Sequence, residues 1–147
     1  MILVDANLLL YAYNPSFDRH KQARAWLESV LSRPDPVCLA WATILAFLRI
    51  ATNPRAFEYP LSMDEAIPIV SAWLAQPMVT ILEPGDRHWA VLTELLSRTQ
   101  VRGPAVMDAH LAALAIEHGA ELCTSDRDFA RFPNLRMLNP LEANYKK

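Results

Sequence analysis

The sequence predicts a three-layer α/β/α domain built on a mostly parallel, five-stranded sheet. Short apolar runs typical of strands alternate with longer segments of helical periodicity. Such alternation indicates parallel strands joined by right-handed helical crossovers. The chain has 147 residues, is 52% hydrophobic and contains no Gly- or Ser-rich spacer. We therefore expect residues 1–147 to form a single domain with its own hydrophobic core.

Strands and helices are expected to alternate along the whole chain. The expected strands are Ile2–Asp5, Val37–Ala40, Val79–Leu82, Glu121–Thr124 and a weaker Arg136–Leu138. The expected helices are Asn7–Tyr13, Phe17–Ser32, Trp41–Thr52, Met63–Ala75, Asp86–Thr99 and Met107–His118. Either Ser62 or Asp64 can cap the helix that begins at Met63. Gly119 suits the left-handed residue that ends the last helix.

Four aspartates occupy positions where a mostly apolar sequence would not otherwise carry charge. Asp5 ends the first apolar run, and Asp126 and Asp128 follow the fourth expected strand directly. Asp108 opens an Ala-rich helical segment. Taken singly, each aspartate has a plain structural explanation as a turn, a helix cap or a loop residue. Taken together, they predict a common acidic site.

The expected topology brings these aspartates together. A chain that winds outward through three strands and returns beside the first gives the order 3-2-1-4-5. Asp5 and Asp126 then flank the point where strand order reverses, which is where such sheets bind ligands. Ala112 and Ala115 lie at i+4 and i+7 from Asp108 and let its helix lie close to the sheet, so its carboxylate is expected to face inward.

Carboxylates that lie together in one cleft require a cation to neutralise their charge. They repel each other and raise each other's pKa unless a positive ion neutralises them. Oxygen ligands without His or Cys suit Mg²⁺ or Mn²⁺, which keep coordination positions free for water and for a substrate phosphate. The sequence therefore predicts a divalent metal site.

Composition narrows the function classes. The net charge of -2 and the pI near 6.1 give no general attraction for nucleic acid, so any such contact must be local. No apolar stretch is long enough to cross a membrane, and the first residues lack a basic segment typical of a signal peptide. A cytoplasmic protein without a membrane association is expected.

Four segments make the chain resemble the PIN-domain ribonucleases, and most closely the VapC-type toxins of bacterial toxin–antitoxin pairs. The segments are Leu3–Asn7, Phe47–Pro54, Asp108–Ala115 and Thr124–Phe129. No single segment is specific to this family. The occurrence of all four in this order along nearly the whole chain is specific. The resemblance implies an endoribonuclease that hydrolyses RNA phosphodiester bonds with an activated water and a divalent metal ion.

Carried over residue by residue, the resemblance identifies the catalytic carboxylates. They are Asp5, Asp108, Asp126 and Asp128, of which the first three are expected metal ligands and the last contributes through water or a second ion. No covalent intermediate is needed, and one of these carboxylates accepts the proton of the attacking water.

Further polar residues are expected to support the carboxylates and the substrate. The resemblance implies that Asn7 and the hydroxyl of Thr124 or Ser125 orient the metal ligands. It also covers Arg49, whose guanidinium can bind a phosphate through two hydrogen bonds.

One position departs from the family pattern. PIN nucleases usually carry a glutamate on the helix after the second strand, and Ala46 stands there in this chain. We hypothesise that Thr43, one turn earlier, holds a metal-bound water, and we expect weaker metal binding or a single well-held ion. The alternative is a degenerate PIN domain that acts as a non-catalytic RNA- or protein-binding module. Retention of all four aspartates argues against it.

The resemblance also implies two protein partners. One is a second copy of the chain in a homodimer, and the other is a cognate antitoxin whose peptide segment blocks the acidic crevice. The segments Arg19–Arg33 and Trp41–Ile50 are expected to offer grooves for an amphipathic partner helix.

Overall fold

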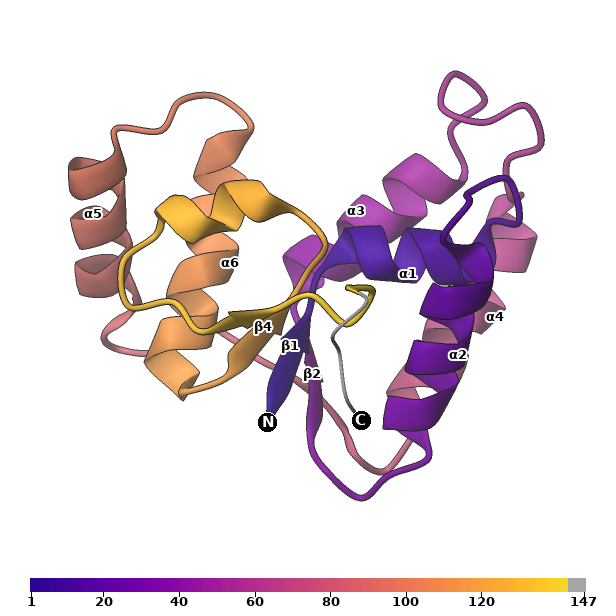
Figure 1. The fold of residues 1–147 in the computed structure, drawn as a ribbon, viewed down its shortest axis with the longest axis horizontal. Coiled ribbons are helices and arrows are strands. Elements are labelled where there is room, and N and C mark those ends of the chain that lie inside the picture. Colours follow the sequence, from indigo (N-terminus) through magenta and orange to yellow (C-terminus); the bar gives the residue numbers. More distant parts are fainter. Residues whose placement is uncertain (143–147) are drawn as a thin grey trace.

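A computed structural model describes residues 1–142 as a parallel sheet with helices on both faces (Figure 1). The strands are β1 (Ile2–Val4), β2 (Val37–Leu39), β3 (Val79–Ile81), β4 (Glu121–Cys123) and β5 (Met137–Leu138). Their order is β3-β2-β1-β4-β5, and each pair of neighbours is parallel. The predicted fold class and strand order are confirmed.

Six α-helices and one 3-10 helix connect these strands. They are α1 (Ala6–Tyr13), α2 (His20–Leu31), α3 (Trp41–Ala51), α4 (Met63–Leu74), α5 (His88–Thr99), α6 (Ala105–His118) and the 3-10 helix η1 (Arg127–Arg131). A capping box between Ser62 and Glu65 begins α4. Gly119 ends α6 in the left-handed conformation, with φ of 67°, as predicted.

Two helix starts differ from the predictions. Helix α2 begins at His20 rather than at Phe17, and α6 begins at Ala105 rather than at Met107. The earlier start of α6 follows a turn at Gly103, whose φ of 58° suits glycine. Each difference lies at an element end, where periodicity carries little information.

The hydrophobic core has two parts, one on each face of the sheet. Helices α1 to α4 bury one part, which includes Leu9, Phe47 and Trp73. Helices α5 and α6 cover the other, together with Leu122 and Phe129. Figure 1 shows these two helical groups on opposite sides of the strands. Apolar burial on both faces is the main stabilising contribution and fixes the sheet edges relative to the helices.

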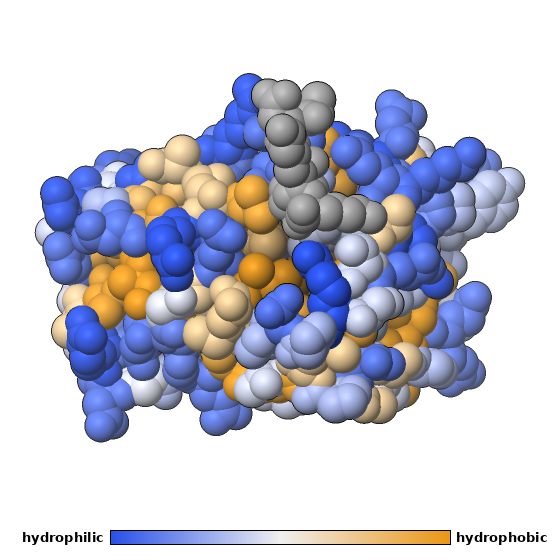
Figure 2. Space-filling view, turned by 60° about the horizontal axis from the view of Figure 1, so that its bottom comes forward, coloured by the Kyte–Doolittle hydropathy of each residue, from blue (hydrophilic) through white to orange (hydrophobic). Residues whose placement is uncertain are grey.

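Apolar side chains also remain on the surface. On the face shown in Figure 2, hydrophobic residues are exposed in separate patches with hydrophilic residues between them. None of the helices formed by residues 1–142 has the length and apolarity required to cross a membrane. Because all five strands run in one direction, their carboxyl ends meet at one edge of the sheet, and the acidic residues follow there.

Candidate active site

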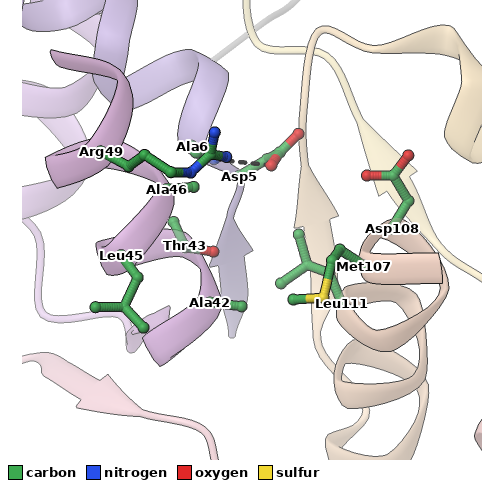
Figure 3. Close-up of a pocket in the computed structure, with 10 residues that line it drawn as sticks. All are labelled: Asp5, Ala6, Ala42, Thr43, Leu45, Ala46, Arg49, Met107, Asp108 and Leu111. Atoms are coloured by element: carbon green, nitrogen blue, oxygen red, sulfur yellow. Dashed lines mark hydrogen bonds between the residues drawn. The ribbon is translucent and has the colours of Figure 1, made fainter. Parts of the chain in front are cut away.

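A cavity of about 540 Å³ opens between α3 and α6, beside the carboxyl end of β1 (Figure 3). Helix α3 lines it with Ala42, Ala46 and Arg49, which share one helical face at i, i+4 and i+7. Asp5 and Asp108 bring carboxylates to the cavity from β1 and α6 respectively. The two acids that sequence placed far apart in the chain therefore line the same space.

Asp5 is held rigidly by two hydrogen bonds. It leaves the sheet in an extended conformation and caps α1, because its Oδ1 accepts a hydrogen bond of 2.8 Å from the Ala6 backbone N–H. Its Oδ2 accepts a second bond of 2.7 Å from the Thr124 hydroxyl. The carboxylate is thus fixed by the start of one helix and the end of a neighbouring strand.

The Thr124 hydroxyl is the centre of this network. The residue is completely buried at the end of β4. Besides donating to Asp5, its oxygen accepts hydrogen bonds from the Asp126 backbone N–H at 3.0 Å and from the Asn7 amide at 3.4 Å. The structure thus gives Asn7 and Thr124 contacts that orient the acidic residues, whereas Ser125 lines a separate hollow next to Asp126.

The remaining two predicted carboxylates lie on η1. Asp126 caps this helix, since its side chain accepts a hydrogen bond of 2.9 Å from the Asp128 backbone N–H. Asp126 is half-buried and Asp128 is exposed. Asp108 is half-buried in the first turn of α6, and its Oδ2 lies 3.6 Å from Nη2 of Arg131. No sequence pattern predicted this arginine.

The charges of neighbouring acids act on both Asp5 and Asp108. Burial raises the pKa of the Asp5 carboxyl, hydrogen bonds from Thr124 and Ala6 lower it, and the nearby charges of Asp108 and Asp126 raise it further. Burial is also the main cause of the raised pKa of Asp108, followed by the charge of Asp126. The like charge of Asp126 thus acts on both carboxyls.

Within residues 1–142, no three His, Cys, Asp or Glu side chains converge closely enough to form a finished metal site. The donor chemistry nevertheless fits a hard divalent cation, because Asp5 and Asp108 offer oxygens from two sides of one cavity. Such a cation would also offset the repulsion that raises their pKa values.

The α3 wall lacks acidic groups. Ala46, at the position of the usual family glutamate, lines the cavity with a methyl group. The Thr43 hydroxyl is buried and has no hydrogen-bond partner within the described residues. Arg49 is exposed, and Figure 3 shows its side chain extending along α3 toward Asp5. This wall offers an unpaired hydroxyl and a cation opposite the carboxylates.

The histidine nearest to Asp108 in sequence serves another purpose. His110 lies on α6 and forms a contact of 3.0 Å with the buried His88 of α5. Nδ1 of His88 in turn lies 3.6 Å from a carboxylate oxygen of Glu117. These side chains join α5 to α6, and neither histidine is among the residues that line the cavity.

A parallel sheet in this order with an acidic cavity at its carboxyl edge defines a class of small α/β domains. The family model for the PIN domain matches residues 2–135. The chain therefore belongs to the PIN-domain family. It is 43% identical over 140 residues to Ribonuclease VapC37 of Mycobacterium tuberculosis, a match that covers 95% of this chain and 97% of the relative. It is 40% identical over 141 residues to Ribonuclease VapC33 of the same species, covering 96% and 99%.

Solved structures share the fold at lower sequence identity. VapBC2 from Rickettsia felis, bound to a DNA fragment from its promoter, contains a chain that matches with a TM-score of 0.68 and 18% identity, covering 95% of this chain and 98% of that chain. VapC20 of Mycobacterium tuberculosis, a toxin that cleaves the sarcin–ricin loop, matches with a TM-score of 0.66 and 19% identity, covering 92% and 99%. At these identities the likeness concerns the fold alone.

Proposed function

We propose that this protein is an endoribonuclease that acts as the toxin of a toxin–antitoxin pair. The observation that carries the proposal is the placement of Asp5 and Asp108 on two sides of one open cavity, each with a raised pKa. Relatives that match almost the full chain at about 40% identity are named as VapC ribonucleases. Their activity, together with this site, supports RNA phosphodiester hydrolysis here.

The proposed cofactor is Mg²⁺ or Mn²⁺, held by Asp5, Asp108 and Asp126, with Asp128 contributing through water. When bound, such a cation supplies Lewis acidity that activates an attacking water and stabilises charge on the leaving oxygen. Asp126 supports this assignment because its charge acts on both Asp5 and Asp108.

Each nearby side chain then has a defined task. Thr124 and Asn7 keep the Asp5 carboxylate in place, because the hydroxyl that binds Asp5 is itself tied to both neighbouring segments. The unpaired Thr43 hydroxyl would hold a water on the α3 side. Arg49 lines the same cavity and would bind a substrate phosphate with its guanidinium fork.

The partners follow from the same surface. Trp41 and Leu45 on α3 and Met107 on α6 are exposed by 50%, 60% and 55% beside the cavity. Apolar side chains at this density suit burial by protein. Several solved structures with this fold are toxin–antitoxin complexes, including one from Klebsiella pneumoniae. We propose that a cognate antitoxin segment covers the α3 face, that the chain forms a homodimer, and that it acts in the cytoplasm.

Cleavage of total cellular RNA tests the function directly. The purified chain, freed of any bound partner, is incubated with Mg²⁺ or Mn²⁺, with EDTA, or as the Asp108→Asn variant. Asp86→Asn, a change at an exposed aspartate before α5, serves as the matched control. We expect discrete products from the wild type and the control variant only. Absence of cleavage by the wild type would contradict the proposal and favour a non-catalytic binding module.

A further inference from the structure

Arg131 is the cation that the structure places next to the acidic site. It ends η1, and its Nη2 lies 3.6 Å from the Asp108 Oδ2, with side chains 37% and 35% exposed. This distance exceeds hydrogen-bond range, so the pair is held by charge without the parallel hydrogen bonds that arginine forms with a carboxylate at closer approach. The guanidinium therefore keeps its donors for another acceptor.

The position of Arg131 is fixed by the same short helix that carries two of the aspartates. Its guanidinium lies over the Phe132 ring, 5.4 Å from the centroid. Phe129 and Phe132 are both buried and anchor η1 to the core. Because Asp126 caps this helix, the arginine and the acidic site are built as one unit.

Charge explains why the site needs such a residue. Four carboxylates repel a phosphodiester, and the chain as a whole carries a net charge of -2. One divalent cation only partly offsets this. Arg49 lines the cavity from α3, and Arg131 approaches Asp108, which lines the cavity from α6. A strand of RNA that crosses the cavity would then meet one guanidinium on each side.

We propose that Arg131 binds an RNA phosphate next to the cleaved bond, and that Asp108 holds its guanidinium until a divalent cation takes over that carboxylate. The inference rests on the proposed ribonuclease function. The cation weakens the attraction between the two side chains, and the freed guanidinium offers a planar fork to a phosphate. Arg131 thus competes with the metal ion for the Asp108 carboxylate, but it strengthens binding of the RNA substrate.

The two roles predict effects of opposite sign in Arg131→Gln. Binding of a fluorescently labelled phosphorothioate RNA in Mn²⁺, followed by anisotropy, should weaken about ten- to hundredfold, as expected for the loss of charge-assisted hydrogen bonds. The slope of log affinity against log salt should fall by about 0.7, the value for one phosphate contact on a single strand. Mn²⁺ binding without RNA, measured by electron paramagnetic resonance of free Mn²⁺, should become tighter, because the competing guanidinium is gone.

Two variants control the test. Arg98→Gln removes the same charge from an exposed site on α5, where Arg98 pairs with Glu94 and with no other acid among residues 1–142, and should leave RNA and Mn²⁺ binding unchanged. Arg131→Lys keeps the charge but not the fork and should restore part of the RNA affinity. Thermal melting of each variant confirms that it is folded.

The possible results separate the two proposals. Wild-type RNA affinity in folded Arg131→Gln overturns the inference, and so does a joint loss of RNA and Mn²⁺ binding, which would make Arg131 a positioning residue for Asp108. If the wild type and Arg131→Gln bind Mn²⁺ and cleave RNA equally well, the inference about Arg131 is contradicted and the ribonuclease proposal is not. A wild-type chain that neither binds Mn²⁺ nor cleaves RNA overturns the ribonuclease proposal as well.

Discussion

The two walls of the cavity are built in contrasting ways. The wall at the end of β1 is backed by a hydrogen-bond network, in which Thr124 at the end of β4 ties Asp5 to the backbone of Asp126 at the start of η1. The α3 wall has a methyl group at Ala46 and a buried hydroxyl at Thr43 that has no partner among residues 1–142. One wall is organised before any ligand arrives, and the other offers groups that only a ligand would pair.

This contrast indicates that one wall supports the chemistry and that the other determines which ligands bind. A hydrogen-bonded wall holds its carboxylate in a fixed orientation, which a metal ligand requires. An open, partly apolar wall tolerates substrate or a partner peptide of varied shape. We therefore expect changes on the bonded wall to cost the most activity, and changes on the α3 wall to tune affinity.

Asp5→Asn should have the largest effect. Asparagine can still cap α1 through its amide oxygen, so the fold should persist, whereas the amide nitrogen that replaces Oδ2 cannot accept from Thr124 and the metal loses a charged ligand. Loss of a supporting group alone costs about ten- to hundredfold, so loss of a ligand should exceed a hundredfold. Initial rates of RNA cleavage in Mn²⁺ measure it, with the exposed Asp18→Asn as control. A rate within a few-fold of wild type would remove Asp5 from the metal site.

Thr124→Val tests the centre of the bonded wall. Valine matches the shape of threonine but leaves the Asp5 Oδ2 and the Asp126 N–H without their bonds. Because these groups are largely buried, we expect a loss of about 1–3 kcal/mol in the free energy of unfolding and a cleavage rate about ten- to hundredfold lower. Urea unfolding and kinetics measure both. Thr93→Val loses a bond to the Ala90 carbonyl in its own helix and should change neither the free energy of unfolding nor the cleavage rate.

Ala46→Glu tests the open wall by adding the missing carboxylate. Position 46 lines the cavity opposite Asp108, so a glutamate there could join a bound cation as a further oxygen ligand. We expect Mn²⁺ affinity to rise by about tenfold, because ligand charge tunes affinity for hard cations. Ala46→Gln adds the same volume without charge and should not reproduce the gain. Equal affinities for both variants would show that the wall lies too far from the ion.

The sequence was most informative where hydrophobic pattern determines structure. The apolar runs that became β1, β2 and β4 are short and bounded by charge or helix signals, so their type and their order in the sheet followed. The alanines after Asp108 correctly predicted that α6 lies close to the sheet with Asp108 at the cavity. Such signals are local and repeat along the chain.

Features that depend on tertiary contacts could not be predicted. Helix η1 has five residues, too few for a periodic pattern, so neither the helix nor the approach of Arg131 to Asp108 had a signal. The contact between His88 and His110 joins residues 22 positions apart on two helices whose packing had to be known first. The apolar wall of the cavity likewise emerges only when α3 and α6 are placed side by side.

The smallest expected effect concerns stability of the metal-free protein. The pKa of Asp108 is raised in the folded state, chiefly by burial, so its charged form is disfavoured there relative to the unfolded chain. In EDTA at pH 7, Asp108→Asn should therefore be more stable to urea than the wild type, because the pair with half-exposed Arg131 contributes little. Below the ordinary value of 3.8 the wild-type carboxyl is protonated in both states, and the gain should vanish.

Added Mn²⁺ should reverse this order at pH 7. The wild type then gains stability by binding the ion only when folded, whereas Asp108→Asn lacks the ligand. The exposed Asp86→Asn should follow the wild type in both conditions. A variant that is less stable than wild type even in EDTA would mean that Asp108 serves the fold rather than the ion. The predicted reversal would instead show that the site holds the charge of Asp108 at a cost that a cation offsets.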